Sequence, residues 1–241
     1  MSDRSSTPRA WLELMRLSNA PTIVSNVLAG GAIAAGDGAM WSPALAPAAA
    51  SMLMLYVAGM ILNDVCDAEV DRLERPGRPI PSGRIGLGAA RGAGAGLIAA
   101  AVVIVALACP SASIATMALV ICIAAYNLLH RRTAWSVLLL GGCRGLVYVV
   151  AAQAAAGEAS PNARLLGACA AFMAAYVVAL SLLARAEAGA RARIRLVVAM
   201  ICAISLIDAG LLVILHQPLA AGAAAGCFIA CAFAQRRIIG T

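Results

Sequence analysis

Charged side chains are scarce in this sequence, and lysine is absent. Only 12% of the 241 residues are charged and 63% are hydrophobic, and the mean hydropathy of +0.91 lies outside the range of soluble domains. We therefore expect a polytopic membrane protein. The net charge of +7 comes from arginine alone. Because the arginines lie in short loops beside apolar runs, they are read as orienting the chain in a membrane, and nucleic acid is not an expected partner.

Clusters of metal-binding or disulfide-forming residues are also missing. The eight cysteines form no CxxC pair and no group with histidine, and most of them lie inside apolar runs. They are interpreted as small buried residues, which excludes a thiolate metal site and a disulfide framework.

Long apolar runs dominate the rest of the sequence. Each is long enough to cross a hydrocarbon layer of ~30 Å as a helix. The runs cover residues 20–36, 43–62, 91–109, 112–128, 135–156, 164–184, 195–215 and 218–235. They predict an all-α bundle of eight transmembrane helices, arranged as two four-helix halves, with the loops at 63–90 and 185–194 forming a cytoplasmic cap.

The distribution of arginine predicts the orientation. Most arginines fall on one side if both termini are cytoplasmic, as positive residues prefer. Residues 1–19 are then a cytoplasmic segment with a short amphipathic helix, residues 20–235 the transmembrane domain and residues 236–241 a cytoplasmic tail. That short helix is either interfacial or a simple extension of the first span. We expect the inner or plasma membrane of a bacterium, with no protein partner indicated.

One stretch, residues 63–84, holds five of the eleven acidic residues. On a helix Asp64, Asp67 and Asp71 share one face, which Asn63 widens. Each close pair of carboxylates costs on the order of 3 kcal/mol at an effective dielectric near 20, so positive charge is expected among them. Ligands that offer only oxygen favour Mg²⁺. The alternative is a solvated acidic helix end neutralised by its own arginines: Arg72, Arg75 and Arg78.

Three prolines follow the acids and cannot continue a helix, so the helix is expected to end near Arg75. Arg78 would then return over the mouth of the bundle. There it would either bind two diphosphate oxygens or simply set the topology.

Residues 63–83, from Asn63-Asp64 through Arg78 to Gly83, resemble the first aspartate motif of the UbiA superfamily of intramembrane prenyltransferases. The resemblance implies that an isoprenoid diphosphate binds through Mg²⁺, and that its prenyl group is transferred to an aromatic or other lipophilic acceptor. It assigns the metal to Asp64, Asp67 and Asp71, with help from Asn63.

The fourth span ends in Tyr126 and His130, which look like the tyrosine and lysine with which the family holds the diphosphate. Here His130 stands at the lysine position, and His130 or Arg131 would supply the positive charge. Tyr126 could equally be an ordinary interfacial aromatic residue.

Polar residues inside the spans are further candidates. Arg144, in the fifth span, is expected to face the bundle interior and bind the acids or an anion, or else to extend to the surface. Asn19 and Asn26 share a face and either approach the cavity or form a packing hydrogen bond. Asp208 is the only acid deep in a late span, with no partner visible in the sequence.

The sequence departs from the family pattern where a second aspartate motif is expected. Residues 181–195 contain no aspartate; Arg185 and Glu187 stand there instead. This arrangement is similar to the EboC-like branch of the superfamily. Two interpretations follow. Arginines could take over the role of a second metal ion, or the protein could be a non-catalytic component that binds or transports a lipophilic metabolite.

Overall fold

The computed structural model describes residues 7–36, 42–157, 159, 161–186 and 191–237. Within these ranges the structure is helical and contains no strand, which confirms the all-α class. The helices are α1 (Thr7–Met15), η2 (Leu17–Asn19), α2 (Pro21–Ala35), α3 (Leu45–Glu74), α4 (Leu87–Ala108), η3 (Pro110–Ala112), α5 (Ser113–Leu129), α6 (Ser136–Ala156), α7 (Ala163–Ala186), α8 (Arg191–Ile214) and α9 (Pro218–Arg237).

Seven helices in this part of the chain, α3 to α9, are long and apolar enough to cross a membrane, where eight had been expected. The first predicted span, residues 20–36, forms α2, whose 15 residues rise only ~22 Å along the axis. Its burial is nevertheless extensive, because α2 packs against α3, α6, α8 and α9. Helix α2 therefore contacts helices of both predicted halves and does not belong to one half.

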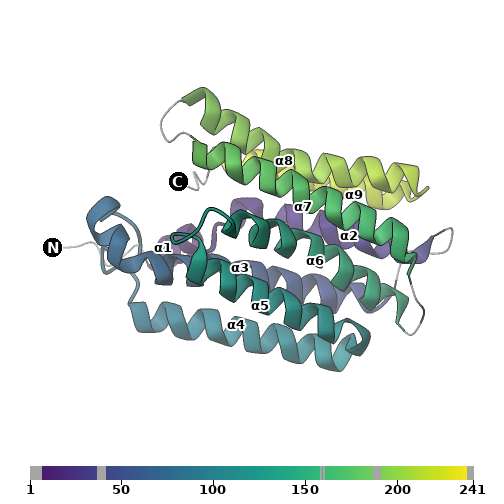
Figure 1. Ribbon diagram of the computed structural model, residues 1–241, viewed down its shortest axis with the longest axis horizontal. Helices are drawn as coiled ribbons and strands as arrows, with labels where there is room; N and C mark the ends of the chain where they lie inside the picture. The colour runs from purple at the N-terminus through teal and green to yellow at the C-terminus, as the bar shows by residue number, and fades with distance from the viewer. Residues whose placement is uncertain (1–6, 37–41, 158, 160, 187–190, 238–241) are drawn as a thin grey trace.

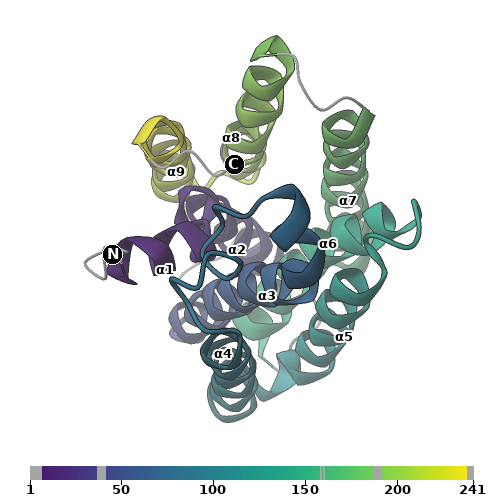
Figure 2. The same cartoon turned by 90° about the vertical axis from the view of Figure 1, so that its left-hand side faces the viewer.

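Successive long helices run in opposite directions (Figure 1). As a result, α1, the α3–α4 loop and the α5–α6 loop gather at one end of the bundle. Seen from that end, α2, α3 and α6 lie toward the middle and the remaining long helices surround them (Figure 2). The arginine-rich segments are thus on a common side, as the charge distribution predicts.

Glycine allows the central helices to pack closely. A Cβ atom on Gly30 of α2 would lie 2.6 Å from the carbonyl oxygen of Tyr148 in α6, and one on Gly141 would lie 2.6 Å from that of Ala174 in α7. Small residues let helices approach closely within a membrane, where packing replaces the hydrophobic effect.

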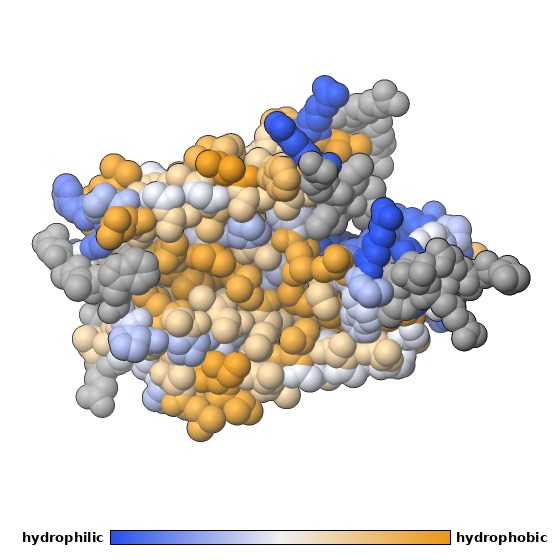
Figure 3. Space-filling model, turned by 180° about the vertical axis from the view of Figure 1, so that it is seen from behind, coloured by the Kyte–Doolittle hydropathy of each residue, from blue (hydrophilic) through white to orange (hydrophobic). Residues whose placement is uncertain are grey.

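On the face shown in Figure 3, the surface of the bundle is apolar over its middle, and hydrophilic residues gather toward the ends. Large side chains that face outward include Leu107, Ile114, Ile121, Val213, Ile229 and Phe233. A soluble monomer rarely exposes so much apolar surface, whereas lipid solvates it well. Together with the seven candidate spans, this surface identifies an integral multi-pass membrane protein.

The acid-bearing end is covered by protein. Helix α3 continues past the apolar run and ends at Glu74, next to Arg75 and the prolines that follow it, as predicted. Ile80 and Ile85 of the following loop pack with Ala10 and Leu14 of α1, so the apolar face of the amphipathic helix rests on protein. The cytoplasmic cap formed with the loop at 185–194 stays a prediction, because residues 187–190 of that loop lie outside the described residues.

Candidate active site

Three carboxylates lie on one face at the end of α3. Asp64 and Asp67 are each only 5% exposed and Asp71 is fully buried. Their spacing of three and four residues places them on one face, as the sequence predicts, and that face points into the protein. Asn63 lies beside them and donates weakly to Asn127, 3.4 Å away. A solvated acidic helix end is therefore not what the structure contains.

Three arginines from three separate segments bind these carboxylates. Arg16, between α1 and η2, places Nη2 2.8 Å from Asp64 Oδ1. Arg78 Nη1, in the α3–α4 loop, lies 2.6 Å from Asp71 Oδ2. Arg131, in the α5–α6 loop, donates from Nε to Asp67 Oδ1 at 2.6 Å. We refer to Arg16, Arg78 and Arg131 as the arginine triad.

Sequence reasoning missed Arg16 and overrated its neighbours. Of the arginines close to the acids in sequence, Arg72 pairs with the exposed Glu69 and Arg75 is exposed. Arg16 reaches the site because its backbone is left-handed (φ 47°) and its carbonyl oxygen accepts a hydrogen bond from Tyr56, 2.8 Å away. The only sequence signal was its place at the break between the amphipathic segment and the first apolar run.

The end of α5 supplies a second contact to Asp67. His130 Nε2 lies 2.9 Å from Asp67 Oδ1, and the ring stacks on Tyr126 with centroids 5.4 Å apart. The sequence left open whether His130 or Arg131 lies at the site. In the structure both residues contact Asp67. The hydrogen bond to Asp67 is the main cause that raises the pKa of Arg131, which keeps this guanidinium charged.

Arg185 does not contact the carboxylates. It donates to the carbonyl oxygens of Ala134 and His130 at 3.2 and 3.4 Å, and to Ser136 Oγ at 2.9 Å. It therefore ties the end of α7 to the loop that carries the triad residue Arg131. Glu187, the other candidate in this region, lies outside the described residues.

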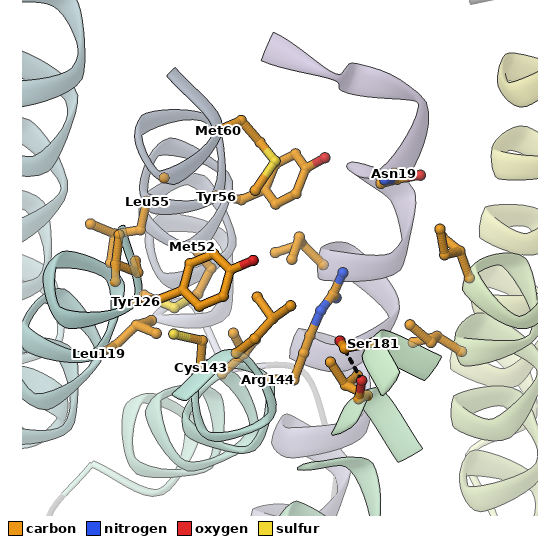
Figure 4. Close-up of a pocket in the computed structure, with 18 of the residues that line it drawn as sticks. Asn19, Met52, Leu55, Tyr56, Met60, Leu119, Tyr126, Cys143, Arg144 and Ser181 are labelled. Atoms are coloured by element: carbon orange, nitrogen blue, oxygen red, sulfur yellow. Dashed lines mark hydrogen bonds between the residues drawn. The ribbon is translucent and has the colours of Figure 1, made fainter. Parts of the chain in front are cut away.

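An apolar cavity of about 200 Å³ lies between the helices. Its walls include Met52, Leu55, Met60, Leu119 and Ile123, and polar groups of Asn19, Tyr56, Tyr126, Arg144 and Ser181 also reach it (Figure 4). Asn127, a partner of Asn63 at the acid face, lines it as well. Through Asn127 and Asn63 the cavity therefore adjoins the acid face.

Arg144 faces the bundle interior and does not extend to the surface. Its partners lie on α2, where Nη1 donates to Asn26 Oδ1 at 2.8 Å and Nη2 to Thr22 Oγ1 at 2.9 Å. Asn26 is fully buried, while Asn19 lines the cavity and accepts a hydrogen bond from Gln235 of α9. The expectation that Arg144 binds the α3 acids is not met by these contacts.

The family model of the UbiA prenyltransferase family matches residues 23–239 of the chain, which is most of its length. The chain belongs to the UbiA prenyltransferase family.

Relatives of this UbiA-family chain are similar over a part of their length. The digeranylgeranylglyceryl phosphate synthase of Ignicoccus hospitalis is 41% identical over 83 residues, which cover 34% of this chain and 26% of that protein. The synthase of Methanococcus maripaludis strain C6 is 37% identical over 83 residues, or 30% of its length. The matched segment thus spans between a quarter and a third of these relatives. Both organisms are archaea, so these matches give no support to the expected bacterial membrane.

Solved structures match over nearly the whole chain. One, described as a structural and mechanistic study of digeranylgeranylglyceryl phosphate synthase, superposes with a TM-score of 0.64 at 17% identity and covers 96% of this chain and 88% of that one. A UbiA homologue from Archaeoglobus fulgidus bound to DMAPP and Mg²⁺ gives a TM-score of 0.59 at 16% identity, covering 94% and 87%. At these identities the likeness establishes the shared fold.

The donor set of this UbiA-family site fits a hard cation in its chemistry. All three acids offer oxygen, and Asp71 Oδ1 is buried without a hydrogen-bond partner. Across the described ranges, however, no three His, Cys, Asp or Glu side chains are grouped closely enough to hold a metal ion. The arginine triad takes up the carboxylate oxygens instead. Metal binding would therefore require these guanidiniums to turn away from the acids.

Proposed function

We propose that this UbiA-family chain is a Mg²⁺-dependent prenyltransferase that moves a prenyl group from an isoprenoid diphosphate to an aromatic or other lipophilic acceptor. The observation that carries the proposal is a site of three buried carboxylates and three guanidiniums that adjoins an apolar cavity. The link between the two is Asn127, which lines the cavity and accepts a hydrogen bond from Asn63 beside the acids. This arrangement suits a ligand with an anionic head and an apolar tail.

In this proposal Asp64, Asp67 and Asp71 hold Mg²⁺ with the assistance of Asn63. When bound, the ion would stabilise negative charge as a Lewis acid. The arginine triad turns from the carboxylates to the diphosphate oxygens, which guanidinium groups bind two at a time. The A. fulgidus homologue bound to DMAPP and Mg²⁺ supports this assignment of cofactor and substrate class.

The reaction breaks the bond between the allylic carbon and the diphosphate oxygen, and forms a bond from that carbon to the acceptor, which loses a proton. The diphosphate leaves with the electron pair of the broken bond, and the arginine triad stabilises the charge that it gains. The cavity holds the prenyl chain and keeps water away from the electron-poor carbon.

We further propose that α2 completes a set of eight spans, and that the acid-bearing end, both termini and the cap face the cytoplasm. The arginine distribution supports this orientation. The short α2 would be accommodated because its neighbours bury it on several sides.

The test is a turnover assay with purified chain, geranylgeranyl diphosphate, Mg²⁺ and a panel of aromatic acceptors. Diphosphate release should require Mg²⁺ and be lost in Asp67→Ala. The matched control is Glu69→Ala, because Glu69 is an exposed acid on the same helix and forms an ion pair with the exposed Arg72. Equal activity in Asp67→Ala and Glu69→Ala would refute the assignment.

A second candidate function is a non-catalytic membrane protein that binds or transports a lipophilic metabolite. One feature favours it: residues 181–195 contain no aspartate, so the usual second set of acids is missing. In the assay above, tight binding of geranylgeranyl diphosphate without any release of diphosphate across all acceptors would support this candidate.

A further inference from the structure

A chain of buried polar side chains connects α2, α6 and α8 inside the bundle. Asp208 of α8 is fully buried and accepts hydrogen bonds from Asn26 at 2.8 Å and Ser25 at 2.5 Å, and from the hydroxyl of Tyr148. Asn26 in turn accepts one from Arg144. We call these five residues, Ser25, Asn26, Arg144, Tyr148 and Asp208, the buried polar network.

The network compensates its own charge. Arg144 and Asp208 are opposite charges joined through a single amide, Asn26, so neither is an isolated ion in the membrane interior. An uncompensated charge at such depth costs several kcal/mol. The guanidinium is thereby both tolerated and held in a fixed orientation.

Only one member of the network reaches the cavity. Arg144 lines it, whereas Asp208 and Tyr148 are buried behind it. A guanidinium has five N–H donors, and in the described part of the structure two hydrogen bonds use them, to Asn26 and Thr22. In Figure 4 the head of Arg144 extends into the space toward which the hydroxyl of Tyr126 also points. Donors therefore remain for a ligand in an otherwise apolar cavity.

This position is distinct from the diphosphate end. Tyr56, which lines the cavity with Arg144, precedes Asp64 by eight residues on α3, or ~12 Å along the helix axis. A small acceptor anchored at Arg144 would span much of that distance and bring its other end toward the carboxylates.

We propose that Arg144 is the recognition residue for an acceptor that carries an anionic group, a carboxylate or a phosphate. The proposal rests on the proposed transferase function. Its physical basis is that a partly buried guanidinium, held in orientation by Asn26 and Thr22, binds an oxyanion more strongly than it binds a neutral group, through charge-assisted hydrogen bonds. If the only role of Arg144 were to join α6 to α2, a neutral amide side chain at this position would do so at a lower desolvation cost.

The test measures the thermal stability of the purified full-length chain in detergent, without Mg²⁺ or prenyl diphosphate. Two probe pairs are titrated: 4-hydroxybenzoate against its methyl ester, and glycerol 1-phosphate against glycerol. We expect the anionic member of one pair to raise the unfolding temperature in a saturable way. A response to 4-hydroxybenzoate would identify a carboxylate as the preferred group, and a response to glycerol 1-phosphate would identify a phosphate. Arg144→Gln should weaken that binding on the order of tenfold or more, while Arg164→Gln, an exposed arginine outside the cavity, should not.

Three outcomes overturn the proposal: no stabilisation by either anion, equal stabilisation by the neutral partner, or unchanged binding in Arg144→Gln. If Arg144→Gln does not fold, Arg144→Lys decides, because it keeps the charge but loses the planar donor set and should bind the anion more weakly. Asp67→Ala should retain anion binding. Loss of turnover in Asp67→Ala thus tests the diphosphate site, while loss of anion binding in Arg144→Gln tests this proposal, so the two can fail separately.

Discussion

At the residue scale, the most informative contacts are those that neighbouring sequence could not indicate. Arg16 and Asp64 are 48 positions apart and form an ion pair at 2.8 Å, whereas Arg72 and Arg75, close to the acids in sequence, point away from them. A helix turns by about 100° per residue, so proximity in sequence does not place a side chain on the same face. The arginine triad is for this reason a property of the folded chain.

The contact of Arg16 gives the first prediction. Arg16→Gln removes a guanidinium from the proposed diphosphate site, so KM for geranylgeranyl diphosphate should rise about tenfold or more, the usual effect of losing a charge-assisted hydrogen bond. Steady-state kinetics at saturating Mg²⁺ measures this. Arg9→Gln is the control, since Arg9 is exposed on α1. An unchanged KM in Arg16→Gln would remove Arg16 from the site.

At the scale of the elements, α2 and α6 are held together by a close approach at Gly30. We predict that Gly30→Ala lowers stability by roughly 1–3 kcal/mol, because its Cβ would lie 2.6 Å from the Tyr148 carbonyl oxygen and 2.8 Å from Ala151 Cβ. Gly210→Ala, in a helical position with nothing within 4 Å, should be neutral or slightly stabilising. Thermal unfolding in detergent compares the two variants. Equal unfolding temperatures of Gly30→Ala and Gly210→Ala would show that α2 and α6 can move apart at this contact without loss of stability.

The contact between α7 and the α5–α6 loop gives a third prediction. Arg185 binds the loop that carries His130 and Arg131, so Arg185→Gln should loosen that loop and lower kcat/KM several-fold. Its action is indirect, so hydrogen exchange of the loop amides should accelerate in the same variant. Unchanged exchange together with lower activity would instead indicate direct contact of Arg185 with the substrate.

At the scale of the whole molecule, the proposed orientation can be measured through cysteine accessibility. Cys66 is exposed at the acid-bearing end. A membrane-impermeant maleimide should label it in inside-out vesicles but not in right-side-out vesicles, with mass spectrometry identifying the site. Ser111→Cys is the matched control, because Ser111 is exposed at the opposite end and should show the reverse pattern. The opposite result at both sites would invert the proposed topology.

The sequence by itself determined the class of the protein, the approximate bounds of its helices and the face on which the three aspartates lie. These properties depend on local composition and periodicity: apolar runs set the spans, prolines end α3 after Glu74, and a spacing of three and four residues aligns side chains.

The tertiary structure alone decided how charges and helices that are distant in sequence pair. It brought Arg16 and Arg131 to the carboxylates, gave Asp208 its partners on α2 and α6, turned Arg144 toward the cavity and placed the short α2 between both parts of the bundle. Within an apolar bundle many pairings satisfy the same local pattern. Close packing at small residues and the cost of leaving a buried charge unpaired select among them.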